Sequence, residues 1–166
     1  MDDHWRIDLF GGLEVRRGER RIQRFPTRKT ASLLAYLACH GEKPVAREVL
    51  AEAFWPEHNT ESSRNSLRVA LNGLRKVLED PDLPTDKPLL QTDRSAVSLC
   101  PGTFTTDVSD FESALKDERN AADPDARKEA LVHAVELYRG PLLAGWYEEW
   151  IDLEQARLAK AELQQL

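Results

Sequence analysis

The stretch that decides the fold is SSRNSLRVALNGLRKVL, residues 62–78, which has the periodicity of one amphipathic helix. At about 100° per residue, four leucines share one face: Leu67, Leu71, Leu74 and Leu78. The opposite face, called the polar face below, carries Arg64, Asn65, Arg68, Asn72, Arg75 and Lys76. A solvated helix face usually mixes charges of both signs, whereas this one has no carboxylate of its own. The segment therefore predicts a helix that packs through leucines and presents a basic surface.

The residues around this helix predict strands, two shorter helices and a hairpin. Residues 5–25 alternate apolar and polar positions between glycine turns, which is typical of short strands. Thr27 is the expected N-cap of a first helix, and a second, short helix is expected over residues 47–55. Residues 89–99 predict a hairpin with Asp93-Arg94-Ser95 near its tip. This order gives an α+β fold with the layout of a winged helix-turn-helix.

The second half has a different composition. Residues 1–104 contain 16 Lys and Arg against 15 Asp and Glu, whereas residues 105–166 contain 7 against 14. The net charge is therefore +1 for the first part and −7 for the second. We predict a DNA-binding domain over residues 1–102 and an all-helical domain over residues 103–166. The last helix has no stop signal, which indicates that the sequence ends inside a longer protein.

Apolar periodicity also predicts which side chains of the second half are buried. The helix after Asp123-Pro124 has an expected buried face of Ala130, Leu131, Ala134, Val135 and Leu137. The expected buried face of the last helix contains Trp150, Ile151, Leu153, Leu158 and Leu163. Gly140-Pro141 should separate two antiparallel helices, whose shared core is expected to include Tyr138, Leu142, Trp146 and Trp150.

The polar face favours DNA binding, because arginine and asparagine match guanine and adenine edges in a major groove. Arg68 and Asn72 are the expected base readers, whereas Arg64, Arg75 and Lys76 suit either bases or phosphates. An ordinary solvated basic face is the alternative interpretation.

Several segments resemble a known family. Five segments resemble the OmpR-type winged helix found in SARP-like bacterial activators. They are LLAYLA (33–38), KPV (43–45), LA (50–51), FWP (54–56) and RNSLRVAL (64–71). Two later segments, DVSDFE (107–112) and LYRGPLL (137–143), resemble the start of the bacterial transcriptional activation domain (BTAD). Two departures are Ala46, where relatives often have a Ser or Thr cap, and Ala96-Val97-Ser98-Leu99, which replaces a Gly-Tyr-Arg-Leu close of the wing.

The resemblance implies an OmpR-type winged helix-turn-helix followed by a TPR-like all-α domain, here truncated. Its members bind direct repeats in promoters as side-by-side protomers and recruit RNA polymerase. The expected partners are therefore double-stranded DNA, RNA polymerase and a second protomer on the DNA. An adaptor, whose helical half binds a partner while the winged helix does not read DNA, is the alternative function.

Four further residues are candidates for DNA contacts, each with a second interpretation. Arg28 and Lys29 lie in a first helical turn, where cations oppose the macrodipole, so they suit a phosphate role or plain solvation. Trp55 suits core packing or a contact near the phosphates. Arg94, at the hairpin tip, suits a groove or phosphate contact or an exposed turn. The arginines between residues 16 and 24 are expected on a solvated strand face rather than on DNA or polymerase.

Other classes of protein are not indicated. The sequence has no apolar run of membrane-spanning length and no signal-peptide layout, so a cytoplasmic protein is expected. Two distant cysteines suit a reducing compartment, and the scattered histidines lack metal-ligand spacing. The glycine-rich phosphate loop, the nucleophile elbow and the zinc-protease motif are all missing from the sequence. We therefore expect no enzyme activity, no cofactor and no metal.

Overall fold

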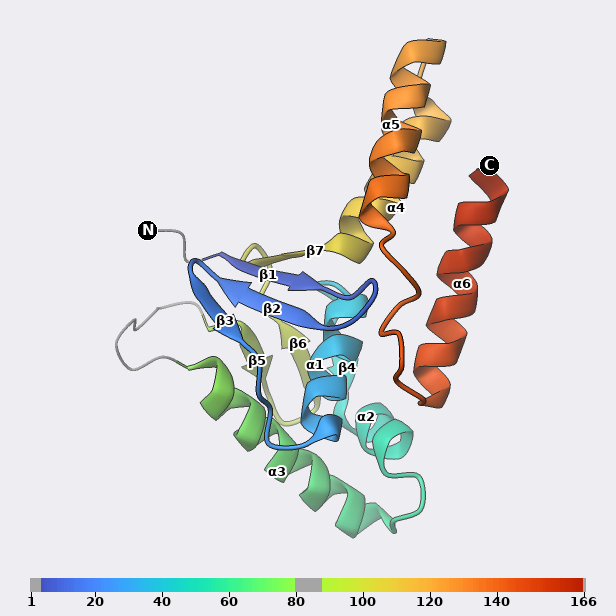
Figure 1. Cartoon of the computed structure of the whole chain (residues 1–166). Coiled ribbons are helices and arrows are strands. Elements are labelled where there is room, and N and C mark those ends of the chain that lie inside the picture. The colour runs from blue at the N-terminus through green and yellow to red at the C-terminus, as the bar shows by residue number, and fades with distance from the viewer. Residues whose placement is uncertain (1–3, 80–87, 166) are drawn as a thin grey trace. The chain divides into compact units, whose positions relative to one another are not determined.

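The computed structural model describes residues 4–79 and 88–165, with side chains as far as residue 160. The predicted strands, three helices, hairpin and further helices occur in the predicted order (Figure 1). Two short strands that were not predicted are added, one between the first two helices and one after the hairpin. The strands are β1 (Trp5–Asp8), β2 (Glu14–Arg17), β3 (Arg20–Ile22), β4 (Val45–Ala46), β5 (Leu90–Thr92), β6 (Ala96–Leu99) and β7 (Phe104–Thr106). The helices are α1 (Arg28–Cys39), α2 (Arg47–Phe54), α3 (Thr60–Leu78), α4 (Asp107–Asn120), α5 (Pro124–Leu137) and α6 (Glu149–Gln165).

The strands form two sheets. The first has the order β3-β2-β1-β7, and its antiparallel β2–β3 pair sets Val15 opposite Ile22. The second has the order β4-β6-β5 and sets Leu90 of β5 opposite Leu99 of β6. The β5–β6 pair is the predicted hairpin and is called the wing below. The two-residue strand β4 pairs antiparallel with β6, so the start of α2 is tied to the wing.

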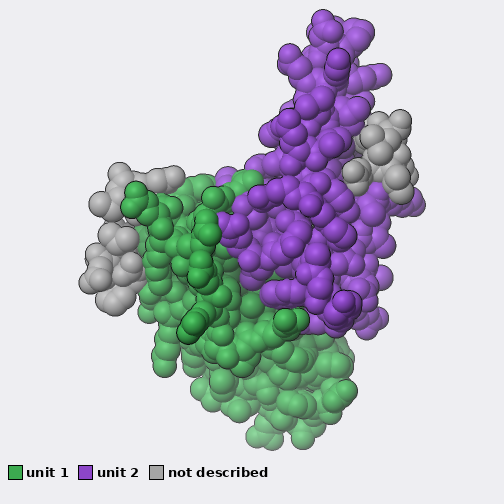
Figure 2. Space-filling view, viewed as in Figure 1, with its two compact units in different colours: residues 1–6, 15–104 green, residues 7–14, 105–166 purple. Residues whose placement is uncertain are grey.

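The chain divides into two compact units (Figure 2). Unit 1 comprises residues 1–6 and 15–104, and unit 2 comprises residues 7–14 and 105–166. Helices α1–α3 and the wing all belong to unit 1, whereas α4–α6 belong to unit 2. Packing thus groups residues 7–14 with the later helices, although they precede the first helix in sequence. The functional boundary near residue 102 stays a prediction.

Aliphatic side chains from each element of the winged helix fill the core of unit 1. Leu33 of α1, Leu50 of α2, Leu74 of α3 and Leu99 of β6 have relative exposures of 0%. Burying one such side chain contributes roughly 1.5–3 kcal/mol relative to leaving it in water. These contacts fix the direction in which α3 faces solvent.

The first two helices begin differently. Thr27 is the N-cap of α1, as predicted, and its Oγ1 accepts a hydrogen bond from the Thr30 amide at 3.1 Å. Ala46 is the N-cap of α2 and makes no side-chain capping bond. Instead, the Arg47 amide donates to the carbonyl of Ser95 in the wing at 2.9 Å. The wing therefore satisfies the N–H of the first helical residue, one of the donors that a helix start leaves without an intrahelical partner. A Ser or Thr cap would instead accept from the second or third residue of the helix.

A buried carboxylate organises unit 2. Asp107, at the first position of α4, is 1% exposed. Its Oδ1 accepts from the Leu9 amide at 2.8 Å and its Oδ2 from the Phe10 amide at 2.9 Å. The guanidinium of Arg139 lies 3.3 Å from Asp8 and 3.9 Å from Asp107. The charge is thus hydrogen-bonded and paired, as a buried carboxylate requires.

The aromatic residues of unit 2 only partly follow prediction. Tyr138 packs against Phe10 and Phe111, with ring centroids 4.9 and 5.7 Å apart. Leu142 is buried as expected, whereas Tyr138, Trp146 and Trp150 are only half-buried. Helices α5 and α6 run in opposite directions (Figure 1), but α5 packs against α4 rather than α6, so the predicted core between α5 and α6 is wrong.

The predicted buried face of α5 is wrong for most of its residues. Ala134 is buried, but Val135 is 46% exposed and the neighbouring Val132 is 47% exposed. Ala130, Leu131 and Leu137 are intermediate. Helix α5 packs against α4, and one neighbouring helix covers only a narrow stripe of its surface.

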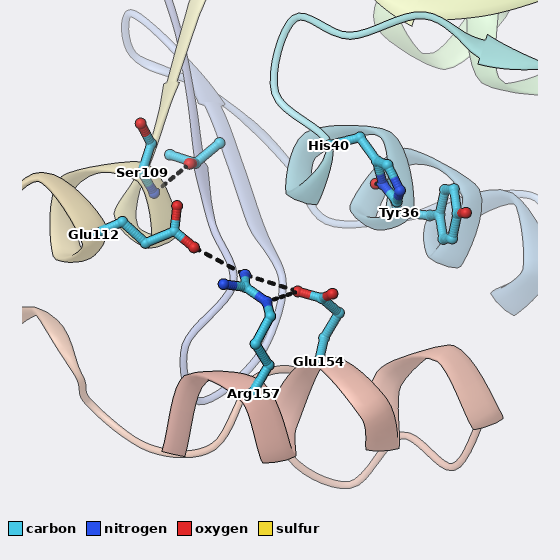
Figure 3. A network of polar contacts seen from close by, with 7 residues as sticks. Tyr36, His40, Ser109, Glu112, Glu154 and Arg157 are labelled. Carbon is cyan, nitrogen blue, oxygen red and sulfur yellow. Dashed lines mark hydrogen bonds and ion pairs between the residues drawn. The ribbon is translucent and has the colours of Figure 1, made fainter. Parts of the chain in front are cut away.

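Helix α6 combines buried apolar residues with a surface ion-pair network. Ile151 and Leu158 are buried as predicted, Leu153 is 67% exposed, and the side chain of Leu163 lies outside the described residues. Figure 3 shows Arg157 pointing toward Glu112 of α4 and Glu154 of α6, at 2.8 and 2.9 Å.

Candidate nucleic-acid interface

Helix α3 is held at both ends by hydrogen bonds. Asn59 is its N-cap, and the Asn59 Oδ1 accepts from the Ser62 amide at 2.8 Å. At the other end a guanidinium nitrogen of Arg20 donates to the carbonyl of Val77 at 3.0 Å. The 19-residue helix between them is about 28 Å long at 1.5 Å per residue. It is long enough for one end to enter a DNA groove while the other stays in the core.

The two faces of α3 have the predicted burial. Leu67, Leu71, Leu74 and Leu78 are buried, with exposures of 2%, 2%, 0% and 6%. Five of the six residues of the polar face are exposed: Arg64, Asn65, Arg68, Asn72 and Lys76. The sixth, Arg75, is half-buried. Val69 lies outside the leucine face, and its apolar side chain is 57% exposed.

A cleft of about 730 Å³ brings part of the polar face together with the wing. Its lining comes from the start of α2, the first half of α3 and the tip of the wing. The predicted site residues among its walls are Arg64, Asn65, Arg68 and Arg94. Residues separated by about 30 positions in sequence therefore form one basic concavity.

Glu48 of α2 lines the same cleft, and sequence reasoning missed it. Its Oε1 lies 2.9 Å from a guanidinium nitrogen of Arg64, and the two side chains are 78% and 61% exposed. An ion pair this exposed contributes about 0–1 kcal/mol, so Arg64 can exchange this partner for another anion at small cost. The helix also carries Glu61 in its first turn, on the same side as Arg64, so two carboxylates lie near the start of the polar face.

Two other residues of the polar face have partners within unit 1. Arg68 donates to the side-chain oxygen of Asn65 at 2.7 Å, which leaves the Asn65 amide nitrogen for other acceptors. Arg75 donates to Thr92 Oγ1 of β5 at 2.9 Å. Arg75 thus ties the end of α3 to the wing, a role that the helical pattern did not reveal.

The tip of the wing is ordered by a carboxylate. Asp93 Oδ1 accepts from the Ser95 amide at 2.7 Å and from the Ala96 amide at 2.8 Å. These bonds, led by that from Ser95, lower the pKa of Asp93 below its ordinary value. Arg47 of α2 donates to the Asp93 carbonyl at 2.7 Å. The turn therefore presents the exposed Arg94 side chain from a fixed backbone.

Arg28, Lys29 and Trp55 lie outside the described lining of the cleft. The Nζ of Lys29 donates to the carbonyl of Phe54, the last residue of α2, and lies 5.2 Å from the centre of the Trp55 ring. Lys29 thus places a cation at the C-terminus of α2, where the helix dipole favours it. This contact accounts for its position in α1 without a phosphate. Arg28 is exposed in the first turn of α1.

The arginines between residues 16 and 24 do not form the uniformly solvated strand face that was expected. Arg17 is 5% exposed, and its guanidinium lies 5.7 Å from the centre of the Trp5 ring. Arg20 is half-buried against the end of α3. Arg21 and Arg24 are exposed. Two of these arginines therefore serve packing and capping, because an arginine stem can be buried while its head keeps a partner.

Within residues 4–79 and 88–165, no group of three or more His, Cys, Asp or Glu side chains is placed to hold a metal ion. No helix in the same ranges combines the length and hydrophobicity needed to cross a bilayer.

Comparisons with known proteins now bear on this geometry. Residues 25–96 match the family described as "Transcriptional regulatory protein, C terminal". This span contains α1, α2, α3 and the tip of the wing. Residues 25–96 form an OmpR-type winged helix. The matched segment, which is less than half of the chain, includes every predicted site residue.

A solved structure shares the fold of almost the whole chain. Mycobacterium tuberculosis EmbR, in complex with a low-affinity phosphopeptide, matches with a TM-score of 0.79 at 21% identity. The match covers 98% of this chain and 43% of the EmbR chain, so this chain spans less than half of that protein. Comparison with curated protein sequences gives no significant match.

These findings confirm the α+β fold with a winged helix. The SARP-like character of the whole chain stays a prediction from the family resemblance. The family match ends at residue 96, so a BTAD after residue 102 stays a prediction.

Proposed function

We propose that this chain is a sequence-specific DNA-binding transcriptional activator that reads the major groove with the polar face of α3. The observation that carries the proposal is the cleft, in which Arg64 and Arg68 of α3 lie with Arg94 of the wing. All three side chains are exposed. A basic concavity between a helix and a hairpin complements the phosphate backbone on either side of a groove. The transcriptional-regulator family of residues 25–96 supports the same function independently.

The residues of the polar face take different roles in this proposal. Arg68 and Asn72 read bases, because both side chains are exposed. The Arg68 guanidinium can donate two hydrogen bonds to O6 and N7 of guanine, and the Asn72 amide can donate to N7 and accept from N6 of adenine. Arg64 and Lys76 contact bases or phosphates. Arg75 donates one N–H to Thr92 and keeps other N–H groups for a phosphate.

The flanking candidates divide into two groups. Arg94 contacts a phosphate or the minor groove from the wing, and Arg28 contacts a phosphate from α1. Lys29 and Trp55 instead act within the fold, since Lys29 is bonded to α2 and lies over the Trp55 ring. Asn65 supports Arg68 through the 2.7 Å hydrogen bond and offers its amide nitrogen to the groove.

The second half supplies the activating function in this proposal. Its charge of −7 repels DNA, which leaves its surface for RNA polymerase. Support for that partner, and for promoter direct repeats bound by side-by-side protomers, comes from the family resemblance of residues 107–112 and 137–143.

The test is selection of bound sequences from a random duplex pool, followed by titration of the selected site at low and moderate salt. We expect one repeated half-site at helical-turn spacing and an affinity that falls steeply with salt. An adaptor would retain no duplex at either salt concentration, and that result would overturn the proposal.

Substitutions in the full 166-residue chain test whether DNA binds at the cleft. Arg68→Ala should cost about 1–3 kcal/mol on the selected site and relax the preference at one base pair. Lys43→Ala removes another exposed positive charge, one outside the cleft lining, and is the control. If the Arg64→Ala/Arg68→Ala double variant stays folded and keeps full affinity for the selected site, α3 is not the reading element.

A further inference from the structure

Val69 is an exposed apolar residue within the polar face of α3. Its relative exposure is 57%, whereas those of Leu67 and Ala70 are 2% and 8%. Asn65 precedes it by four residues and Asn72 follows it by three, so the three side chains share one side of the helix. Single exposed valines are common on protein surfaces. This one, however, lies between two amides on the face proposed to meet DNA.

Helix stability does not account for a valine at this position. Valine ranks below lysine, arginine, glutamine and glutamate as a helix former, because its branched side chain loses rotamer freedom. An exposed position that served only solvation would favour one of those residues. Burial does not account for it either, since more than half of the side chain is exposed.

We propose that Val69 is a specificity-determining residue that contacts the 5-methyl group of a thymine, an inference that rests on the proposed DNA-binding function. The thymine methyl is the apolar group at the base edges of the major groove, and asparagine pairs with the N6 and N7 edge of adenine. A valine beside asparagines therefore complements a stretch that contains A·T pairs. The polar face carries four cations, whereas Glu61 in the first turn is the acid on this side of α3, so the net charge attracts the nearby phosphates.

The experiment removes single methyl groups from the DNA. Each thymine of the selected half-site is replaced in turn by deoxyuridine, which differs only by that methyl, and dissociation constants are measured by fluorescence anisotropy. The proteins are the unsubstituted chain, Val69→Ala, and Val49→Ala as the matched control. Val49 is a 48% exposed valine of α2 that lies off α3. Thermal unfolding of each variant checks that the exposed substitutions leave the fold intact.

We expect one thymine at which uracil weakens binding of the unsubstituted chain about fourfold, the value of one buried methyl-sized group. Val69→Ala should be insensitive to that same replacement, whereas Val49→Ala should retain the fourfold loss. Equal sensitivity of Val69→Ala and the unsubstituted chain at every thymine would overturn the inference while leaving the proposed function standing. If the pool yields no preferred sequence at all, the proposed function fails, and this inference fails with it.

Discussion

Helices α3 and α5 both carry apolar residues at helical spacing, yet α3 buries most of them and α5 buries only Ala134. Four leucines of α3 are at most 6% exposed, whereas Val132 and Val135 of α5 are nearly half exposed. The α3 leucines meet α1 and α2, whereas α5 packs against α4. Periodicity therefore describes what a helix is able to bury, and the neighbouring elements decide what it does bury.

The outward faces of the two helices differ as well. The polar face of α3 contains arginine, lysine and asparagine, whereas α5 exposes both signs, including Asp125, Lys128 and Glu136. Mixed charges are typical of a solvated face. A helix that is anchored on one side and carries a clear excess of positive charge on the other is suited to bind an anionic surface. The four cations of the α3 polar face outnumber Glu61, the acid in the first turn of the same helix.

The largest expected difference between these helices is in core stability. Leu71→Ala should lower the free energy of unfolding of unit 1 by roughly 2–5 kcal/mol, because it leaves a cavity in a packed core. Val135→Ala should change stability by about 0.5 kcal/mol or less, because the side chain is 46% exposed. Urea unfolding measures both. Similar losses for the two variants would mean that α5 is covered as fully as α3.

The sequence predicted the winged helix well because its determinants are local. Thr27 caps α1, the leucines of α3 are buried, and Asp93 forms the turn of the wing as the pattern indicated. The candidates on α3 could also be chosen from sequence, because the rotation per residue fixes which side chains share a face. The helical pattern alone does not predict that Arg94 and Arg64 line the same cleft. That expectation required the layout of the whole winged helix.

What the sequence did not reveal depends on partners far along the chain. Glu48 meets Arg64 across two helices, and Lys29 meets Phe54 across 25 residues. Arg20 bonds to the end of α3 from a separate strand. A long cationic side chain has several anionic or carbonyl partners within reach, so its charge alone does not say which one it meets.

The N-caps test whether the two helices differ in cooperativity. Asn59 of α3 and Asp123 of α5 each accept a backbone N–H at 2.8 Å. Replacement by alanine should cost about 1 kcal/mol in each case. In Asn59→Ala the loss should appear in the unfolding of unit 1, since α3 is part of its core. In Asp123→Ala it should appear as faster hydrogen exchange of the first turn of α5. If both substitutions lowered the global stability equally, the two helices would not differ in cooperativity.

A smaller effect distinguishes the outward faces. Lys76→Ala on α3 should weaken binding to all DNA sequences alike and lower the slope of log affinity against log salt by about one unit. Lys128→Ala removes the same exposed charge from α5 and should leave the slope unchanged. Titrations at three or more salt concentrations measure it. Equal slopes for the Lys76 variant and the unsubstituted chain would place this lysine away from the phosphates.

The smallest expected effect concerns how helices are attached within unit 2. Arg157 of α6 meets Glu112 of α4 at 2.8 Å, but the two side chains are 49% and 46% exposed. Arg157→Gln should therefore lower stability by less than about 1 kcal/mol, and added salt should shrink the difference further. Lys160→Gln, at an exposed position of the same helix, controls for the change in net charge. A loss above 2 kcal/mol that persists in 1 M salt would show that charge, rather than the buried Ile151 and Leu158, holds α6 in unit 2. Helix α6 would then differ from α3, which is attached through its buried leucines.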